Sequence, residues 1–404
     1  MATYKEQNKL NVPHLRFPEF HGEWGVSTIG EQFDLYSGNT PSRLNKEHFE
    51  GNVNWITSGE LKEHYISDTK EKISEDAATA NNLKLLHPGT FVIAIYGLEA
   101  DGVRGTGSIT CKESTISQAC MAFTQKGDVK NEFLYSWYKK HGNIIGIKYA
   151  QGTKQQNLSY DILEKFHIAY PSQDEQDKLI KFISLLDERI ASQSKLIEKL
   201  ESLIKGINQR VFMNSGNNYK LGEICEIRSG YFGSQLLSKK GLKVSRIETI
   251  SGHKVNMERV GYVAPFESSE NYRLRVGDIL FSNINSVEYI GNTAFIDKDY
   301  DLYHGMNLLR LTPNHMVVIP FYLYLLLNTN RMLNRFKAVC NKAVSQASIN
   351  QTELGKTVVQ IPPINTQEQI CELYQALYTK LETESHTKSL FQNQKQYMLR
   401  QMFI

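Results

Sequence analysis

The amino-acid sequence predicts an α+β protein built from two repeated α/β domains and two long helices that pair as a coiled coil. Three observations predict this fold. Residues 173–213 carry a heptad pattern, residues 366–404 form a second helical stretch, and the segments before these stretches share landmarks in the same order. A repeat on this scale indicates that one structural unit occurs twice.

The composition is that of a globular protein with room for two cores. Its 404 residues are 41% hydrophobic and 22% charged, and the formal net charge is +3. Five cysteines lack metal-ligand or redox spacing, and there is no signal peptide and no run of eighteen apolar residues. We therefore expect a cytoplasmic, reduced protein without a metal, whose nucleic-acid binding, if any, depends on local groups.

The repeat sets the expected boundaries. Residues 28–38 match 220–230, with seven residues between the two glycines in both halves, and residues 155–171 match 346–362 at a constant offset. Short helices with a shared phenylalanine, 132–135 and 320–323, lie between these landmarks. The predicted parts are a first domain at 1–172, a helix at 173–213, a small polar linker at 214–218, a second domain at 219–365 and a helix at 366–404.

The first long helix carries its apolar residues in alternating steps of three and four, which defines a coiled-coil seam. The seam is Leu179, Ile183, Leu186, Ile190, Gln193, Ile197, Leu200, Ile204, Ile207 and Val211. Gln193 is its one polar layer and is expected to set the register of the helix pair. Acidic and basic residues are balanced along the helix, so it is a poor phosphate binder and needs a partner helix.

The partner is expected to be the second long helix of the same chain. Both helices follow a proline with a Glu-Gln pair, at 175–176 and at 368–369. The second seam is weaker: Ile370, Leu373, Leu377, Leu381, Phe391, Met398 and Met402 are interrupted by Glu384, Lys388 and Lys395. Antiparallel pairing would relate the domains by an approximate two-fold axis, but the sequence alone leaves the direction open.

Motifs for catalysis are missing. There is no GxxxxGK[ST] loop, no HExxH, and no Asn/Asp-Pro-Pro-aromatic loop of the kind that holds a flipped adenine. The one Pro-Pro pair, at 362–363, opens a helix, where proline is common. We therefore expect no catalytic residues in this chain.

Loops in both halves carry groups that suit DNA contact: amides and hydroxyls for bases and phosphates, guanidinium groups for guanine edges and lysines for the backbone. In the first half they are Ser37, Asn39, Thr40, Ser42, Arg43, Ser58, Lys62, Tyr96, Arg104, Lys148, Thr153, Lys154, Gln155 and Asn157. In the second they are Arg228, Tyr231, Lys239, Lys243, Arg246, Asn283, Asn285, Lys342, Ser345, Gln346 and Ser348.

The same residue types are also common in turns, so each loop alone has a purely structural interpretation. Gln155 and Gln346 favour the functional one, because they keep their place in both repeats. A turn at a helix N-terminus would explain these two glutamines equally well.

Together with the segment 13–20 and Trp24, the repeat and the two helices resemble the specificity subunit of type I restriction-modification systems. Residues 37–42 are similar to that family's entry loop into its first target-recognition domain, and residues 155–171 to the exit into a conserved helix. The second half departs from the pattern at 231–233, and residues 117–119 only approximate the Asn-Gln of many relatives.

The resemblance implies that each domain reads one half of an interrupted target in double-stranded DNA, while the helices set the spacing and dock partners. It also implies two methyltransferase subunits, which would bring S-adenosylmethionine, and motor-nuclease subunits in the full complex. This chain itself would bind no cofactor, no metal and no membrane. A second hypothesis is a structural tether that holds two protein-binding domains apart without reading DNA sequence.

Overall fold

The computed structural model describes residues 11–100, 102–152, 156–212, 216–342 and 346–404, and the side chain of Lys342 lies outside this description. The chain forms two compact units, Met1–Ser194 with His386–Ile404, and Lys195–Ser385. We call them unit 1 and unit 2. Each unit contains one α/β domain and about half of each long helix, α5 (Gln173–Val211) and α10 (Ile364–Met402).

The domain of unit 1 is built around a sheet with strand order β2-β9-β6-β7-β4. It also contains a smaller sheet with strand order β5-β3-β8. Its elements in chain order are β1 (Gly25–Thr28), α1 (Ile29–Gln32), β2 (Phe33–Ser37), η1 (Lys46–Phe49), β3 (Val53–Ile56), η2 (Ser58–Glu60), β4 (Tyr65–Ile66), β5 (Lys72–Ile73), α2 (Glu75–Ala80), β6 (Phe91–Ala94), β7 (Gly107–Thr110), β8 (Ser114–Ile116), β9 (Cys120–Gln125), α3 (Asn131–Tyr149), α4 (Tyr160–Leu163) and β10 (His167–Tyr170). Strand β10 closes the domain by pairing with β1, immediately before α5 begins.

The domain of unit 2 repeats this order with a main sheet β12-β18-β15-β17 and small sheets β13-β14 and β16-β20-β19. Its elements are β11 (Asn217–Lys220), α6 (Leu221–Ile224), β12 (Cys225–Ser229), β13 (Leu242–Val244), η3 (Ile247–Ile250), η4 (Met257–Arg259), β14 (Gly261–Val263), η5 (Ser269–Tyr272), β15 (Ile279–Ser282), β16 (Ile284–Asn285), β17 (Thr293–Phe295), β18 (Leu308–Pro313), α7 (Pro320–Leu327), α8 (Asn330–Val339), β19 (Asn341–Lys342), β20 (Ala347–Ser348), α9 (Gln351–Gly355) and β21 (Val358–Ile361). Strands β11 and β21 pair as β1 and β10 do.

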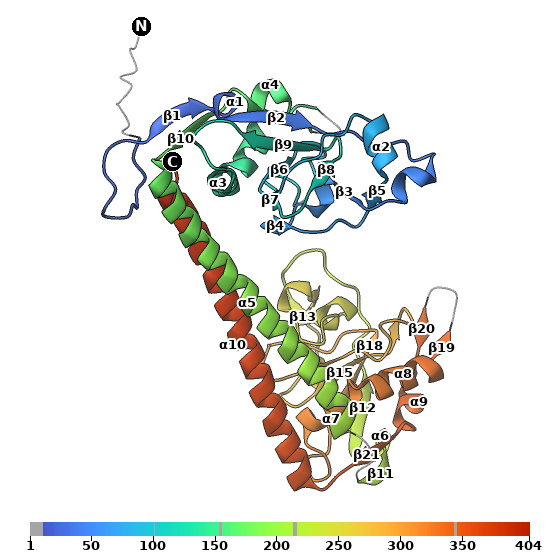
Figure 1. The fold of residues 1–404 in the computed structure, drawn as a ribbon. Coiled ribbons are helices and arrows are strands. Elements are labelled where there is room, and N and C mark those ends of the chain that lie inside the picture. The colour runs from blue at the N-terminus through green and yellow to red at the C-terminus, as the bar shows by residue number, and fades with distance from the viewer. Residues whose placement is uncertain (1–10, 101, 153–155, 213–215, 343–345) are drawn as a thin grey trace. The chain divides into compact units, whose positions relative to one another are not determined.

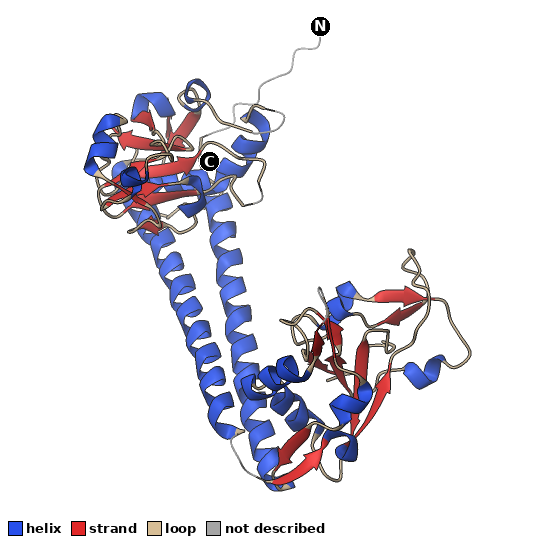
Figure 2. Ribbon diagram, turned by 90° about the vertical axis from the view of Figure 1, so that its right-hand side faces the viewer, coloured by secondary structure: helices blue, strands red, loops and turns tan. Residues whose placement is uncertain are grey.

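The two long helices lie side by side and run antiparallel in both units (Figures 1 and 2). In unit 1 the start of α5, at Leu179 and Ile183, shares a hydrophobic core with the end of α10, at Leu399 and Met402. In unit 2 Ile204, near the end of α5, shares a core with Tyr374, near the start of α10. The expected repeated α/β domains and coiled-coil helices are therefore confirmed, and the structure decides the direction.

The ten predicted seam residues of α5 are all buried or half-buried. The seam predicted for α10 is wrong at one place, because Leu373 is 42% exposed while the neighbouring Tyr374 is fully buried. Glu384 and Lys395, predicted to interrupt this seam, form ion pairs instead. Glu384 pairs with Lys380, and Lys395 Nζ lies 2.5 Å from an Asp187 carboxylate oxygen of α5.

Two buried glutamines attach the long helices to the domains. The Gln176 side chain accepts a hydrogen bond from Lys130 N–H at 2.9 Å and donates to the carbonyls of Asp128 and Pro171, both at 3.1 Å. The Gln367 side chain accepts from Ile319 N–H at 2.8 Å and donates to the carbonyls of Val317 and Pro362 at 3.1 and 2.8 Å. Both are 0% exposed. Each glutamine therefore bonds both to the start of an earlier helix, α3 or α7, and to the carbonyl of the proline at the end of its own domain.

These bonds correct the predicted alignment of the helices. Gln176 corresponds to Gln367 at the same offset that relates Pro171 to Pro362, so the Glu-Gln pair at 368–369 is not the counterpart of the pair at 175–176. Because the glutamines bond at Lys130 and Ile319, Phe133 corresponds to Tyr322 rather than to Phe321. The predicted linker is also shorter than expected, since Asn217 and Asn218 belong to β11; residues 214 and 215 lie outside the described residues.

A charged cluster fastens the domain of unit 1 to both helices. The His64 ring lies between Tyr65 and Tyr135, with ring centroids 4.1 and 3.9 Å away. Its Nε2 is 2.9 Å from Glu132, and its Nδ1 is 3.2 Å from Asp187, the carboxylate that also holds Lys395. Burial by itself would lower the pKa of His64, but hydrogen bonds with Asp187 and Glu132 outweigh it and raise that pKa.

Candidate nucleic-acid interface

In unit 1 the structure brings three of the predicted DNA-contacting segments together around one surface hollow. Ser37 comes from the end of β2, Tyr96 follows β6, and Gly152 and Asn157 flank the segment before α4. Tyr160 also lines the hollow and is 45% exposed. A hydroxyl, an amide and two phenol groups are thus available at one place, which suits hydrogen bonding to base edges and sugar-phosphate oxygens.

Unit 2 assembles the corresponding segments as a small sheet. Ile284 and Asn285 of β16 pair with Ser348 and Ala347 of β20, and β19 pairs on the other side of β20. Asn283 is half-buried and donates from its amide to Ile349 C=O at 3.4 Å. The predicted Asn283, Asn285 and Ser348 therefore lie together, and Gln346 is exposed directly before β20.

A backbone hydrogen bond that occurs once in each unit shows that these two surfaces are equivalent. Leu158 N–H donates to Ile95 C=O, and Ile349 N–H donates to Asn283 C=O, both at 2.9 Å. In each unit the loop after a central strand, β6 or β15, is joined to the segment that precedes the last short helix. The frame is shared while the side chains around it differ, as expected for two readers of different sequences.

The repeated Ser-Gly step at the start of each variable loop has a steric cause. A Cβ added to Gly38 would lie 1.8 Å from the Ile116 carbonyl oxygen, and one added to Gly230 would lie 1.8 Å from the Gly305 carbonyl oxygen. Both glycines let the edge strand pass close to a neighbouring backbone. Ser37 and Ser229 are thereby held at the exposed ends of β2 and β12.

Several predicted arginines are already engaged within their own unit. Arg43 forms a two-point ion pair with Glu71, at 2.6 and 2.8 Å, and lies 4.7 Å from the Phe49 ring centroid. The bond to Glu71 raises the pKa of Arg43. Arg228 pairs with Glu226 at 2.5 Å, and Arg246 lies 3.4 Å from Glu248.

Arg104 donates to the Gln156 side chain at 3.1 Å, next to the unit 1 hollow. Asn39 bonds to Thr40 N–H and to the Asn81 carbonyl, so its amide supports the loop. Tyr231 stacks on Phe266 with ring centroids 3.9 Å apart, which is a packing role on at least one ring face.

The remaining predicted residues fall into three groups. Ser42, Lys62 and Lys239 are exposed, whereas Ser58 and Lys243 are half-buried. Lys148 is exposed but lines a different hollow, beside Trp137 and Phe166, away from the Ser37 surface. Thr153, Lys154, Gln155 and Ser345 lie outside the described residues, as does the side chain of Lys342.

Sequence reasoning missed the residues that position these surfaces. His64 carried no motif, because its partners Glu132, Asp187 and Lys395 are scattered over the sequence. Gln176 and Gln367 could have been found, since they share the offset of Pro171 and Pro362. Among the described residues no group of histidine, cysteine and carboxylate side chains could hold a metal, and no helix could cross a membrane.

Comparison with known proteins gives a consistent result. The family model described as the type I restriction modification DNA specificity domain matches residues 21–202 and 215–390. A putative type I restriction enzyme specificity subunit (MjaX) of Methanocaldococcus jannaschii is 38% identical over 188 residues, which are 46% of this chain and 44% of that protein. The MjaVIII specificity subunit of the same organism is 23% identical and is matched over 99% of this chain and 96% of its own length.

Two solved structures share the fold. The type I restriction-modification S subunit from M. genitalium has a TM-score of 0.58 at 18% identity, covering 97% of this chain and 99% of that one. A chain from a structure on the complex assembly and conformational transition of the type I system has a TM-score of 0.60 at 17% identity, covering 93% of this chain and 96% of that one.

Proposed function

This chain belongs to the type I restriction modification DNA specificity family, whose model matches both of its halves, and we propose that it is the DNA sequence-reading subunit of such a system. The observation that carries the proposal is the reading surface built twice on one backbone frame, at Ile95–Leu158 and at Asn283–Ile349. Two similar frames with different side chains suit a target made of two unlike halves. The tether hypothesis is not favoured by this family membership.

Each domain reads one half of the target in this proposal. In unit 1 the reading groups are Ser37, Tyr96, Asn157 and Tyr160, and in unit 2 they are Asn283, Asn285, Gln346 and Ser348. Arg43 and Arg228 are not primary base readers, because their guanidinium groups are paired with carboxylates of their own domain. The antiparallel helices set the spacing between the half-sites, since their length and register determine where each domain is attached.

Methylation and cleavage reside in partner subunits. We propose two methyltransferase subunits, which bind S-adenosylmethionine and flip the target adenines, and motor-nuclease subunits in the restriction complex. The described residues of this chain offer no cluster for a metal, and the groups at the two reading surfaces are hydrogen-bonding groups rather than an acid-base pair. This chain itself recognises the DNA sequence and sets the spacing between the two half-sites.

A footprinting experiment tests this function. The full chain is purified with its methyltransferase partner, and protection is mapped on a DNA library. We expect protection of one bipartite sequence, with a steep salt dependence of affinity because phosphate contacts release counterions. Replacement of residues 1–156 by those of a relative should change one half of the target only. Protection without sequence preference, or a change in both halves, would contradict the proposal.

A further inference from the structure

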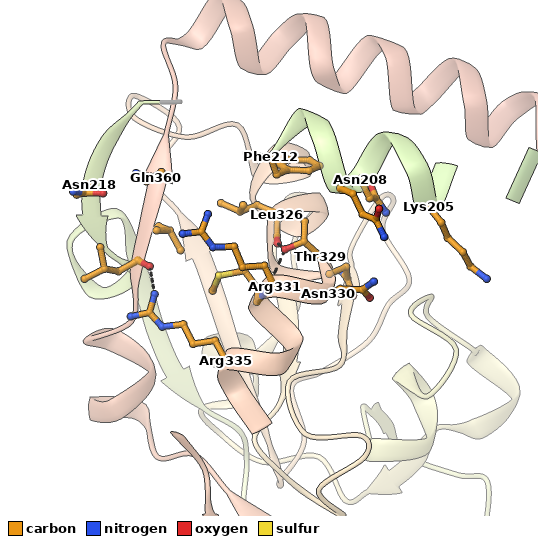
Figure 3. A pocket seen from close by; sticks show the side chains of 15 residues that line it. Lys205, Asn208, Phe212, Asn218, Leu326, Thr329, Asn330, Arg331, Arg335 and Gln360 are labelled. Carbon is orange, nitrogen blue, oxygen red and sulfur yellow. Dashed lines mark hydrogen bonds between the residues drawn. The ribbon is translucent and has the colours of Figure 1, made fainter. Parts of the chain in front are cut away.

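One phenylalanine of unit 2 differs from all the others in the chain. The 18 phenylalanines all lie within the described residues, and Phe232 is the only exposed one, at 72%. Phe212, by contrast, is half-buried; its ring centroid lies 5.5 Å from that of Tyr322, and it lines a cavity of ≈ 540 Å³ together with Leu326 (Figure 3). Packing within unit 2 therefore does not explain the position of Phe232.

The residues on both sides hold Phe232 in place. Tyr231 N–H donates to His304 C=O at 2.9 Å, and the Tyr231 ring stacks on Phe266 with ring centroids 3.9 Å apart. Gly233 lies so close to this ring that an added Cβ would be 2.2 Å from Tyr231 Cε1. The backbone that presents Phe232 is thus supported before any contact forms, so that little ordering is needed when the ring binds a partner.

The strand pairing places Phe232 at the reading surface of unit 2. Ser229 of β12 and Phe281 of β15 pair with the same residue of β18, Leu309, from opposite sides. Both strands run antiparallel to β18, so both end at the same edge of the main sheet. Phe232 follows Ser229 by three residues at this edge, and Asn283 follows Phe281 by two. The exposed ring therefore shares its sheet edge with a proposed reading residue.

The segment around Phe232 has a charge that suits DNA. Residues 230–243 contain Lys239, Lys240 and Lys243 and no acidic residue. Lys239 and Lys240 are exposed, and Lys243 is half-buried in β13. Lysines at this place suit the phosphates next to a base that the ring contacts.

Unit 1 has a different residue at the equivalent place. Ser37 of β2 and Ile93 of β6 both pair with Met121 of β9, as Ser229 and its partner strand do in unit 2. Thr40 therefore corresponds to the exposed phenylalanine, and it is half-buried. An aromatic contact at this edge would thus occur in one of the two half-sites only.

We propose that Phe232 stacks on a base of the half-site that unit 2 reads, while the lysines of residues 230–243 contact the neighbouring phosphates. This inference rests on the function proposed above. Neighbouring bases cover each other's faces in a duplex, so the ring can stack only where it opens one base step. Pyrimidine–purine steps open most easily, so we expect the half-site of unit 2 to contain one. This half-site is thus recognised by its deformability as well as by hydrogen bonds.

An apolar patch of the methyltransferase partner is the competing occupant, because Leu236 and Leu237 are exposed as well. DNA is favoured for two reasons. The ring shares its sheet edge with Asn283, and its loop carries three lysines, whereas the cores of protein–protein interfaces are depleted in lysine.

A scan with abasic nucleotides tests the stacking contact. The full chain is bound to its methyltransferase partner and to the target found by footprinting, in which an abasic nucleotide replaces each nucleotide of both half-sites in turn. We expect Phe232→Ala to weaken binding about tenfold on intact DNA, because it removes one stacked base. Where the stacked base itself is missing, the same substitution should cost less than about twofold, because the two changes remove the same contact. That position should lie in the half-site that stays unchanged when residues 1–156 are exchanged.

Three further variants serve as controls. Phe232→Trp keeps a flat aromatic ring and should bind intact DNA within about threefold of the unmodified chain. Leu237→Ala removes an exposed apolar side chain from the same loop, and Met316→Ala removes one that follows β18 at the opposite edge of the sheet. Both should change the affinity less than about twofold, because neither side chain has an aromatic face. Hydrogen exchange in unit 2 should be the same in all variants, because the three replaced side chains are exposed.

Several results would overturn the proposal. They are an unchanged affinity of Phe232→Ala for intact DNA, or a loss of the same size at every abasic position. An equal loss in Leu237→Ala overturns it in favour of a general apolar contact. Weaker binding of the methyltransferase subunit to Phe232→Ala, measured by calorimetry without DNA, overturns it in favour of protein docking. In all these cases the unmodified chain still protects a bipartite sequence, whereas protection without sequence preference by that chain refutes the proposed function itself.

Discussion

Unit 1 and unit 2 share a frame but differ in how that frame is completed. Both contain a strand pair that closes the domain, a buried glutamine at the base of a 39-residue helix, and a Ser-Gly step at the first loop. The segment whose start bonds to the shared glutamine is one helix of 19 residues, α3, in unit 1, whereas in unit 2 it is divided into α7 and α8, of 8 and 10 residues. The strand pair, the glutamine and the Ser-Gly step therefore position the domain, whereas the helices that bond to the glutamine vary.

The attachment of the domains to the helices also differs in chemistry. Unit 1 uses the charged cluster of His64, Glu132, Asp187 and Lys395, while the counterparts of Glu132 and Asp187 in unit 2, Phe321 and Tyr378, form an aromatic contact. The glutamine bonds are the same in both. We infer that the glutamines fix the attachment point and that the surrounding packing can be exchanged.

Replacement of the phenylalanine at the end of each long helix should give the largest difference in stability loss between the two units. Phe403 is 2% exposed and lies 5.1 Å from the Phe133 ring, whereas its counterpart Phe212 is half-buried at the rim of a cavity. Phe403→Ala should cost about 3 to 5 kcal/mol of stability and Phe212→Ala less than half of that. Hydrogen exchange resolved by peptide measures each unit separately; equal losses would mean that the cavity of unit 2 is closed in solution.

The buried glutamines should behave alike in the two units. Gln176→Leu and Gln367→Leu each leave a buried N–H and two carbonyls without a partner, so each should lose about 3 kcal/mol. Urea unfolding followed by tryptophan fluorescence reports the first, because all three tryptophans lie in unit 1, and hydrogen exchange reports the second. The exposed Gln173→Leu and Gln369→Leu are matched controls. A large effect in one unit only would break the equivalence of the two attachments.

The His64 cluster predicts a pH dependence confined to unit 1. Because hydrogen bonds with Asp187 and Glu132 raise the pKa of His64 above 6.5, its contribution is complete below that pH and is lost as the pH rises through the folded-state pKa. The pKa of Asp187 is lowered despite its burial, so its contribution is present above about pH 4 and is lost as the pH falls through its folded-state pKa.

Tryptophan-monitored unfolding between pH 5 and 9 measures this dependence. We expect His64→Gln to flatten the alkaline side of the stability profile, and the exposed His87→Gln to leave the profile unchanged. Tyr65, Tyr135 and Lys139 also face the cluster, and burial lowers the pKa of Lys139 to about 8. Lys139 acts in the opposite direction, because its lowered pKa makes stability rise as the pH rises through about 8. A profile that His64→Gln does not alter would therefore contradict the role assigned to His64.

The smallest effects are expected at the arginines engaged in surface ion pairs. Arg43→Lys and Arg228→Lys should change stability by about 0.5 kcal/mol or less and leave DNA affinity nearly unchanged. The exposed Lys62→Ala, by contrast, should reduce the salt slope of DNA binding by about one if that lysine contacts a phosphate. Titration of DNA at several salt concentrations distinguishes the two. A loss of preference for one base in Arg43→Lys would show that Arg43 leaves Glu71 to read DNA.

The sequence predicted much of the reading surface as a set of separate loops. Ser37, Tyr96 and Asn157 were singled out from different segments, and the structure places them around one hollow. Their grouping could not be predicted, because it depends on the backbone bond between Ile95 and Leu158, which no local pattern encodes. The ion pair of Arg43 could not be predicted for the same reason, because Glu71 lies far from it in the sequence. The pair of Arg228 could have been predicted, because Glu226 stands two residues before it and points to the same face of β12.

The sequence by itself determined the duplicated domains, the two long helices and the family, because heptad spacing and a constant repeat offset are one-dimensional signals. Only the tertiary structure decided the antiparallel direction, the Tyr374 register and the role of Lys395, which depends on Asp187 of the other helix. It also formed the cavity that Phe212 lines. Such features arise where residues far apart in the chain meet, and their burial and pairing follow from those contacts alone.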